Sequence, residues 1–225
     1  MKCIIFDFDG TILSSKEIAK KAMDRAVQEL NIKKCNISLY NKQLFYPELL
    51  VKIIGVEENL SVQEEENLLS AYKKYLKNEE EKAQIDEAIV RAINIFKKEE
   101  VLLAIYSDRK TENLVSLLKK LDLKNSFSII CGRDLMQPKP STEFIDYLTE
   151  KYDIRKSDIL FIGDTDVDYL VAKRSGIYYV HAKYSNELSN ESWKYCDKML
   201  EKTAEIEVLI KDFLQNGVKN ESRTC

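Results

Sequence analysis

Five short apolar runs lie along the chain, each bounded by polar or turn-forming residues. They span residues 3–6, 101–106, 127–131, 159–162 and 177–180. Short runs without polar alternation are typical of parallel strands that are buried on both faces of a sheet. Between the later runs, apolar residues recur at helical spacing, as in Leu114, Leu117, Leu118 and Leu121. The pattern therefore predicts an α/β protein with a doubly wound, mainly parallel five-stranded core sheet.

A long stretch with helical patterns separates the first apolar run from the second. Ser14 and Glu17, and likewise Ser61 and Glu64, have the spacing of a capping box, in which two side chains bond to each other's backbone N–H groups at a helix start. Residues 47–54 form a further helical segment. The whole stretch is too long for an ordinary crossover connection. The expected domains are an α/β core of residues 1–14 and 83–217, a small α-helical cap of residues 15–82 and a disordered tail of residues 218–225.

The composition is typical of a soluble globular protein and narrows the class of function. Of 225 residues, 44% are hydrophobic and 32% are charged, with a formal net charge of −3. Because lysine and arginine are dispersed among acidic residues, we expect no nucleic-acid partner. No apolar stretch approaches the roughly 18 residues of a membrane span, so we expect no membrane partner and a cytoplasmic location. Five scattered cysteines without a C-x-x-C pair argue against a disulfide framework or a zinc site.

Polar side chains follow three of the predicted strands, and a lysine precedes a later helix. These residues are Asp7 and Asp9 after the first strand, Ser107 after the second, Asp164 and Asp168 after the fourth, and Lys139 between two prolines. In open α/β sheets, ligands bind beyond the carboxyl ends of the strands. If the strands are neighbours, their ends can converge on one small ligand. Gly10 permits a sharp turn and a close approach of the backbone to that ligand.

The clustered carboxylates predict a cation. If they meet a phosphate group, each pair of unit charges at 4 Å costs about 4 kcal/mol at an effective dielectric of 20. Lys139 alone cannot neutralise this repulsion. A hard divalent cation with oxygen ligands can, and Mg²⁺ prefers such sites alongside phosphates. In metal-free protein, the alternative is proton uptake by one or more of the aspartates.

With these four motifs in order, the chain resembles the haloacid dehalogenase superfamily of phosphatases, in the subgroup with a helical cap after the first strand. Its layout is similar to that of phosphoglycolate phosphatases and β-phosphoglucomutases. The resemblance implies that Asp7 attacks phosphorus and that Asp9 protonates the leaving oxygen and later activates water. Lys139 would steady the phosphate and the nucleophile. The predicted substrate-binding residues are Ser107, Asp108 and Gly10.

The resemblance also implies the cofactor and its ligands. Family members commonly bind Mg²⁺ through the nucleophile, here Asp7, and through the backbone carbonyl of the second aspartate, here Asp9. Asp164 matches the later acidic ligand, and Asp168 would support the metal site. Asp9 also favours phosphoryl chemistry over carbon–halogen cleavage, because dehalogenases of this fold lack the second acid.

The expected function is a Mg²⁺-dependent phosphatase that hydrolyses a small phosphomonoester through an aspartyl-phosphate intermediate. The partner would be a small phosphorylated metabolite, and the protein would be a monomer or a homodimer. One alternative is a phosphosugar mutase of the same fold, which returns the phosphoryl group to its substrate. Another is a phosphate-sensing or partner-binding module without turnover.

Several residues have a simpler interpretation. Ser107 can be a helix cap, Lys139 a solvated lysine, and His181 a structural residue of the last strand. The sequence departs from the family at Asp108, where asparagine is frequent, and Arg109 can offset this added negative charge. It also departs after Lys139-Pro140, where Ser141 and Thr142 stand in place of a frequent second proline. In the cap, the candidates for selecting the leaving group are Tyr40, Lys42, Phe45, Tyr46 and Lys52.

Overall fold

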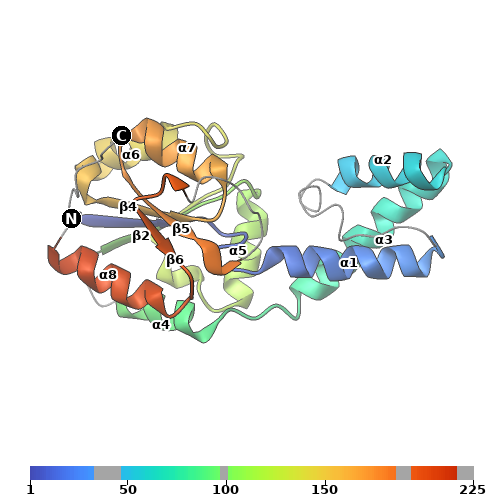
Figure 1. Cartoon of the computed structure of the whole chain (residues 1–225), viewed down its shortest axis with the longest axis horizontal. Coiled ribbons are helices and arrows are strands. Elements are labelled where there is room, and N and C mark those ends of the chain that lie inside the picture. Colours follow the sequence, from blue (N-terminus) through green and yellow to red (C-terminus); the bar gives the residue numbers. More distant parts are fainter. Residues whose placement is uncertain (33–46, 97–100, 186–193, 217–225) are drawn as a thin grey trace. The chain divides into compact units, whose positions relative to one another are not determined.

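The computed structural model describes residues 1–32, 47–96, 101–185 and 194–216. The chain divides into two compact units (Figure 1). One unit comprises Met1–Leu13 and Ile85–Cys225, and the other comprises Ser14–Gln84. The predicted disordered tail, residues 218–225, lies outside the described residues. The role of the second unit as a cap stays a prediction.

The first unit contains a parallel sheet of six strands in the order β3-β2-β1-β4-β5-β6. The strands are β1 (Lys2–Phe6), β2 (Val101–Tyr106), β3 (Ile129–Cys131), β4 (Ile159–Gly163), β5 (Tyr178–Ala182) and β6 (Lys198–Leu200). The predicted α/β class and doubly wound parallel sheet are confirmed, but the sheet has six strands rather than five. The short edge strand β6 is only partly buried, so it lacks the apolar run by which the other strands are predicted.

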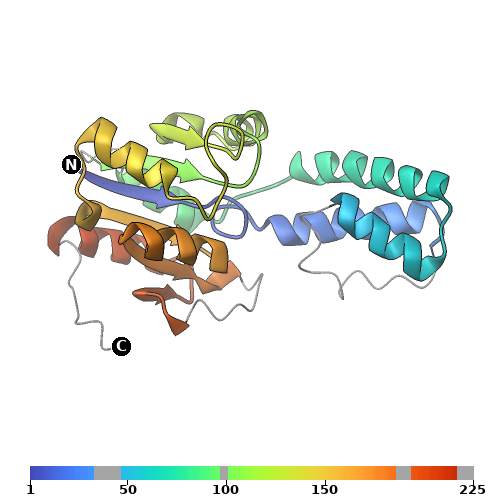
Figure 2. The same cartoon turned by 90° about the horizontal axis from the view of Figure 1, so that it is seen from above.

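Helices cover both faces of this sheet (Figures 1 and 2). They are α4 (Glu87–Phe96), α5 (Thr111–Lys120), α6 (Glu143–Tyr152), α7 (Asp166–Ser175) and α8 (Glu205–Asn216), with short 3-10 turns at Lys124–Ser126, Lys156–Asp158 and Lys183–Ser185. Helices α6 and α7 lie on one face, and α4 and α8 lie on the other. Strand β1 is central, between β2 and β4, so its carboxyl end is flanked by two other strand ends.

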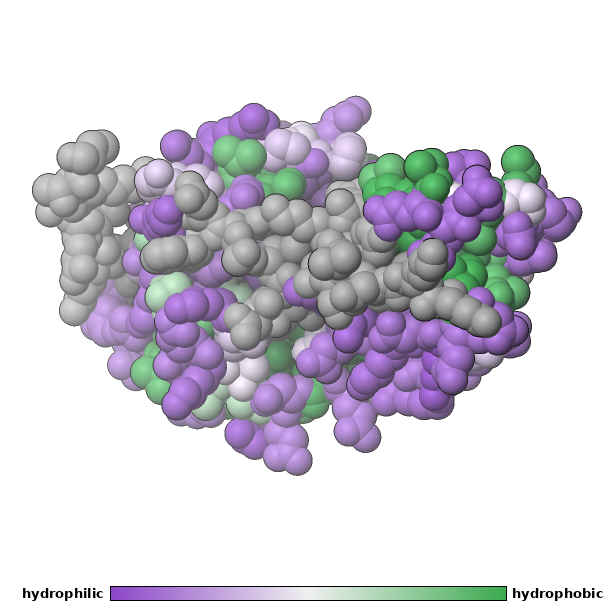
Figure 3. Space-filling view, turned by 45° about the vertical axis from the view of Figure 1, so that its right-hand side comes forward, coloured by the Kyte–Doolittle hydropathy of each residue, from purple (hydrophilic) through white to green (hydrophobic). Residues whose placement is uncertain are grey.

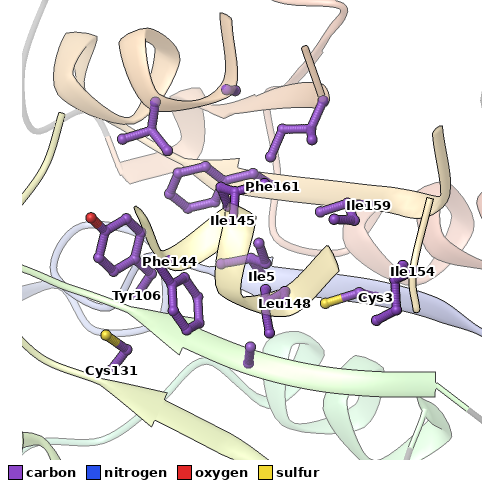
Figure 4. Close-up of a cluster of buried hydrophobic side chains, with 14 of the residues drawn as sticks. Cys3, Ile5, Tyr106, Cys131, Phe144, Ile145, Leu148, Ile154, Ile159 and Phe161 are labelled. Atoms are coloured by element: carbon purple, nitrogen blue, oxygen red, sulfur yellow. The ribbon is translucent and has the colours of Figure 1, made fainter. Parts of the chain in front are cut away.

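The core beneath α6 fixes the three central strands relative to one another. Phe144 of α6 packs against Tyr106 of β2, with ring centroids 4.8 Å apart (Figure 4). Ile5 of β1 and Phe161 of β4 belong to the same buried cluster. Full burial of one such side chain stabilises the fold by about 1.5–3 kcal/mol. The packing therefore holds the polar residues that follow β1, β2 and β4 in a defined arrangement.

The second unit consists of α1 (Ser15–Glu29), α2 (Pro47–Glu58) and α3 (Val62–Glu80) around a separate apolar core. The predicted capping box of α3 forms, because Ser61 N–H donates to Glu64 Oε2 at 2.7 Å and Glu64 N–H donates to Ser61 Oγ at 3.3 Å. The predicted box of α1 does not form. Ser14 has a ψ of 65°, outside the extended conformation of Ser61, and its side chain makes no capping hydrogen bond.

No helix in the described part of the chain combines the length and the apolar character that crossing a bilayer requires. Among the residues that Figure 3 colours by hydropathy, most are hydrophilic, and the hydrophobic ones lie in several groups. Isolated exposed apolar residues such as Leu135 and Val208 are normal for a globular surface. Cys3 and Cys131 are buried, and these two and Cys196 form no disulfide.

Candidate active site

Strand β1 delivers Asp7 to the carboxyl edge of the sheet. Its last four residues are fully buried, and Asp7 continues the pairing with β4 because its N–H donates to Ile162 O at 2.9 Å. Strand β4 ends at Gly163 and is followed at once by Asp164. One carboxylate oxygen each from Asp7, Asp164 and Asp168 lies within 4.8 Å of the others, and all three residues are buried. The structure thus brings together three aspartates predicted to form one site.

Two glycines make room for these carboxylates. Gly10 has a φ of +80°, and a Cβ atom at this position would lie 2.2 Å from Asp164 Oδ2. A Cβ atom on Gly163 would lie 2.6 Å from Cγ of Asp168. Since real Cβ atoms do not approach other atoms this closely, a larger residue at either position requires the carboxylate to move. Gly10 therefore makes room for the carboxylate of Asp164, whereas its predicted contact with substrate stays a prediction.

Lys139 joins two of the aspartates. Its Nζ lies 2.6 Å from Asp7 Oδ1 and 2.6 Å from Asp168 Oδ1, and its side chain is only 3% exposed. The ammonium group also lies 5.3 Å from the ring centroid of Tyr106 and 5.4 Å from that of Phe161, where the faces of both rings attract a cation. Lys139 is therefore a buried, paired lysine and not a solvated one.

The turn that carries Lys139 is anchored by a tyrosine of the sheet. Tyr106 Oη lies 3.1 Å from Gln137 O and 3.3 Å from Ser141 O, so its hydroxyl can donate to the backbone on either side of the lysine. No local sequence pattern indicates this role, because Tyr106 is simply the last apolar position of a strand. The Tyr106 hydroxyl comes within hydrogen-bonding distance of the Gln137 and Ser141 carbonyls only when the chain folds.

Asp168 is held by its own helix as well as by Lys139. Thr165 and Asp168 form a capping box at the start of α7, in which Asp168 Oδ2 accepts from Thr165 Oγ1 at 2.6 Å and from Thr165 N–H at 3.1 Å. The other oxygen, Oδ1, accepts from Lys139. With both oxygens engaged, Asp168 is suited to position Lys139 and to support the site, as the family resemblance implies.

Burial determines the electrostatics of the pair formed by Asp7 and Lys139. Desolvation raises the pKa of Asp7 well above its ordinary value, and the neighbouring carboxylates of Asp168 and Asp9 raise it further, against the attraction of Lys139. Desolvation by itself lowers the pKa of Lys139, but Asp168 and Asp7 outweigh it and the net shift is upward. Lys139 therefore stays charged, whereas Asp7 requires more positive charge nearby to be fully ionised.

The residues present fit a divalent metal ion. Three buried carboxylates face one ammonium group, which leaves two negative charges when all groups are ionised. Clustered carboxylate oxygens are the ligands that Mg²⁺ prefers, and a doubly charged cation balances the excess. The carboxylate of Asp9 is not part of this group. Its predicted contribution, through the backbone carbonyl, stays a prediction.

The loop after β2 carries Ser107, Asp108 and Arg109. Ser107 is buried, and its Oγ accepts from Arg109 N–H at 3.2 Å, which leaves its O–H able to donate. It does not cap α5, whose N-cap residue is Lys110. Asp108 is exposed and accepts a hydrogen bond from the backbone of Lys139. Arg109 binds the carboxylate of Asp9, with Nη2 2.7 Å from Oδ1, and its predicted compensation of the Asp108 charge stays a prediction.

Tyr179 and His181 support the loop behind Asp164. Tyr179 Oη lies 3.0 Å from Gly163 O and 3.3 Å from Thr165 O, the two carbonyls that flank Asp164 in the chain. His181 Nδ1 lies 3.2 Å from the same hydroxyl, and burial lowers the pKa of this histidine. These contacts agree with the structural role predicted for His181. Tyr179 lies within an apolar run, and nothing in its sequence context pointed to the site.

Most of the cap residues that are expected to select the leaving group have no described position. Tyr40, Lys42, Phe45 and Tyr46 lie outside the described residues. Lys52 is exposed on α2 and forms an ion pair with Glu65 of α3 within the second unit. Its proposed part in substrate selection stays a prediction.

Comparison with known proteins assigns the family. A sequence model of the family "Haloacid dehalogenase-like hydrolase" matches residues 4–182, which include all the core site residues described above. The chain belongs to the haloacid dehalogenase-like hydrolase family. The resemblance in the four motifs is thereby confirmed. Membership in this family assigns the protein to the hydrolases and is consistent with the buried cluster of aspartates.

Relatives in this family carry phosphatase names. The chain is 27% identical over 184 residues to phosphoglycolate phosphatase of Aquifex aeolicus, covering 78% of this chain and 82% of the relative. It is 21% identical over 212 residues to pyrophosphatase PpaX of Listeria welshimeri, covering 93% of this chain and 96% of the relative. These similarities support a phosphatase and leave the substrate open.

Solved structures of the family share the fold. A putative β-phosphoglucomutase of Thermotoga maritima superposes with a TM-score of 0.81 at 18% identity, covering 94% of this chain and 99% of that one. A predicted phosphoglycolate phosphatase of Haemophilus somnus superposes with a TM-score of 0.77 at 20% identity, covering 93% and 98%. At these identities the likeness shows the fold alone.

Proposed function

We propose that this protein is a Mg²⁺-dependent phosphatase that hydrolyses a small phosphomonoester through a phosphorylated Asp7. The observation that carries the proposal is the contact of Lys139 Nζ with Asp7 Oδ1 at 2.6 Å, beside the carboxylates of Asp164 and Asp168. A buried carboxylate held by a cation at the edge of a parallel sheet is suited to attack an anionic group that the same cation binds. The phosphatase names of the curated relatives support the same class of reaction.

Asp7 and Asp164 are the proposed carboxylate ligands of the metal, with Asp168 in support and the Asp9 carbonyl as a further ligand. When bound, Mg²⁺ would supply charge neutralisation and polarisation of phosphoryl oxygens. Lys139 would contribute the fixed positive charge that remains in the site throughout the reaction. Its pairing with Asp7 and Asp168 keeps that charge in place before the substrate arrives.

The protein's own groups account for both halves of the reaction. In the first, an oxygen of Asp7 forms a bond to phosphorus, the phosphorus–oxygen bond of the ester breaks, and the leaving oxygen takes a proton from Asp9. In the second, Asp9 takes a proton from water, whose oxygen attacks phosphorus, and the bond to Asp7 breaks. The products are the alcohol and phosphate. Ser107 O–H and Lys139 would donate to the equatorial oxygens as charge develops on them.

Replacement of the nucleophile tests the proposal. The full chain is incubated with Mg²⁺ and a panel of small phosphomonoesters, and phosphate release is followed. Asp7→Asn should lower kcat by about a thousandfold or more, since the covalent step is removed. The matched control is Asp166→Asn, which removes a carboxylate of α7 that is not part of the aspartate cluster and should retain activity. Rapid acid quenching with labelled substrate should leave phosphate on wild-type protein and none on Asp7→Asn.

The alternatives give different results in the same assay. A mutase would convert a hexose 1-phosphate into its 6-phosphate isomer without stoichiometric phosphate release. A binding module would bind phosphorylated compounds while neither wild type nor Asp7→Asn releases phosphate. Either result overturns the proposed hydrolysis, and an Asp7→Asn variant with wild-type turnover overturns the role of Asp7.

A further inference from the structure

Both carboxylate oxygens of Asp9 are engaged by Arg109. Arg109 Nε lies 2.8 Å from Oδ1 and 2.8 Å from Oδ2, and Nη2 lies 2.7 Å from Oδ1. Hydrogen bonds between a guanidinium group and a carboxylate are charge-assisted and directional. The proposed acid–base group is therefore turned toward the arginine. Arg109 therefore competes with a leaving oxygen for the carboxylate of Asp9.

The backbone of Arg109 is fixed while its head group is accessible. Its N–H donates to Ser107 Oγ at 3.2 Å, and its carbonyl accepts from Arg133 N–H at 3.0 Å. The side chains of Arg109 and Asp9 are 19% and 20% exposed, whereas that of Asp7 is 8% exposed. The pair is thus more accessible to solvent than the nucleophile, as a site for the leaving part of a substrate has to be. Because the backbone of Arg109 is held, release of Asp9 has to come from movement of the arginine side chain.

An anion is the chemical group that competes best for Arg109. Guanidinium binds carboxylate and phosphate in the same forked geometry that it uses here for Asp9. A neutral hydroxyl group offers no charge and cannot replace a carboxylate. The neighbouring acid, Asp108, accepts a hydrogen bond from the backbone of Lys139 and is attracted by the charges of Lys139 and Arg133.

We propose that Arg109 is a specificity residue that holds Asp9 until a second anionic group on the leaving side of the substrate takes its place. The inference rests on the proposed phosphatase function and deepens it. The substrate of this protein would then be a phosphomonoester or phosphoanhydride whose leaving group carries a carboxylate or phosphate near the scissile oxygen. Binding of that anion moves Arg109 to the substrate and frees Asp9 to contact the leaving oxygen. The second anion therefore raises kcat and does not act on KM alone.

Three small probes test the inference with the full chain and Mg²⁺. 2-Phosphoglycolate carries a carboxylate, pyrophosphate carries a second phosphate, and ethyl phosphate has a neutral leaving group of similar size. Wild type should turn over at least one anionic probe with a kcat at least about tenfold above that for ethyl phosphate, because a charge-assisted bond is worth that much or more. The two anionic probes separate a carboxylate from a phosphate as the preferred group.

Variants of Arg109 then separate specificity from structure. In Arg109→Gln, the ratio of kcat between the preferred anionic probe and ethyl phosphate should fall at least about tenfold. Arg109→Lys, which keeps the charge but lacks the fork, should give an intermediate ratio. The control Arg133→Gln removes an exposed positive charge from the same side of the sheet and should change the ratio by less than about threefold. Thermal unfolding of each variant identifies any loss of folding.

The outcomes distinguish this inference from the proposed function. If wild type hydrolyses anionic and neutral probes with equal kcat, or if Arg109→Gln lowers all of them by the same factor, Arg109 is only structural and the inference is wrong. Phosphatase activity itself would then still stand. If wild type hydrolyses none of the three probes and Asp7 is never phosphorylated by any compound of the panel, the proposed function and the inference both fail.

Discussion

Gly10 lies so close to Asp164 that a Cβ atom on the glycine would be 2.2 Å from Asp164 Oδ2, and its φ is +80°. Gly10→Ala is therefore expected to displace the carboxylate in addition to straining the backbone. Strain at a positive φ costs about 1–2 kcal/mol. The clash should further weaken Mg²⁺ binding by about tenfold or more. Chemical denaturation and titration of Mg²⁺ by calorimetry measure the two effects.

Gly176 provides the matched control for this substitution. It has a φ of +71° at the end of α7, and a Cβ atom there would meet no atom of the described residues within 4 Å apart from those of the adjoining chain. Gly176→Ala should lose about the same stability from strain but keep the Mg²⁺ affinity of wild type. Equal Mg²⁺ affinities for the two variants would refute the view that Gly10 shapes the metal site.

Removal of Lys139 is expected to affect folding as well as activity. Lys139→Met leaves the buried carboxylates of Asp7 and Asp168 without their cation, which should cost about 3–5 kcal/mol near neutral pH. Loss of a fixed charge at the phosphoryl site should also lower kcat by about a hundredfold or more. Urea unfolding and phosphate release measure these changes.

A surface ion pair serves as the control for Lys139. Lys156 Nζ lies 3.8 Å from Asp146 Oδ1, and both side chains are 48% exposed. Lys156→Met should change the free energy of unfolding by less than about 1 kcal/mol and leave kcat unaltered. If Lys139→Met proves as harmless as Lys156→Met, the buried pair has no structural importance.

The raised pKa of Asp7 predicts how stability depends on pH. Between the ordinary value of 3.8 and the raised value, the folded metal-free protein binds a proton that the unfolded chain has released. Stability changes with pH in proportion to the protons bound by the unfolded state minus those bound by the folded state. That difference is negative here, so the contribution of Asp7 to the free energy of unfolding should decrease as pH rises through this interval.

Mg²⁺ should act against this trend. The ion competes with the proton for Asp7, so its stabilising effect is expected to grow over the same interval. Thermal unfolding at several pH values, with EDTA or with Mg²⁺, tests both statements. Asp7→Asn has no titrating group at this position and should show a flatter dependence on pH without metal. A slope in EDTA that is the same in wild type and Asp7→Asn would assign the proton to another group.

Tyr179 is expected to tune the metal site through the backbone. Tyr179→Phe removes the hydroxyl that contacts Gly163 O and Thr165 O on either side of Asp164. The expected cost is about 1 kcal/mol of stability and about tenfold in Mg²⁺ affinity. The control is Tyr178→Phe, whose hydroxyl reaches Asp197 O at 3.5 Å on the solvent side. A Tyr179→Phe variant with wild-type Mg²⁺ affinity would limit the role of the hydroxyl to stability.

The longer elements of the fold could be predicted from the sequence because their signals are local. Burial on both faces makes a run such as residues 101–106 apolar throughout, and a helix such as α5 repeats its leucines at helical spacing. Edge strand β6 gave no such signal. The prediction of a capping box at Ser14 was wrong, because formation of the box depends on a backbone angle that residue types do not determine.

Which polar residues follow the strands can be read from the order of residues, since the position of Asp7, Ser107 and Asp164 after apolar runs is a property of the chain. Which of these residues meet depends on the folded structure. The contact of Lys139 with Asp7 and the fork of Arg109 on Asp9 join residues 132 and 100 positions apart. Such contacts depend on strand order and packing, because the order places β1 between β2 and β4 and the shared core fixes how their carboxyl ends face one another.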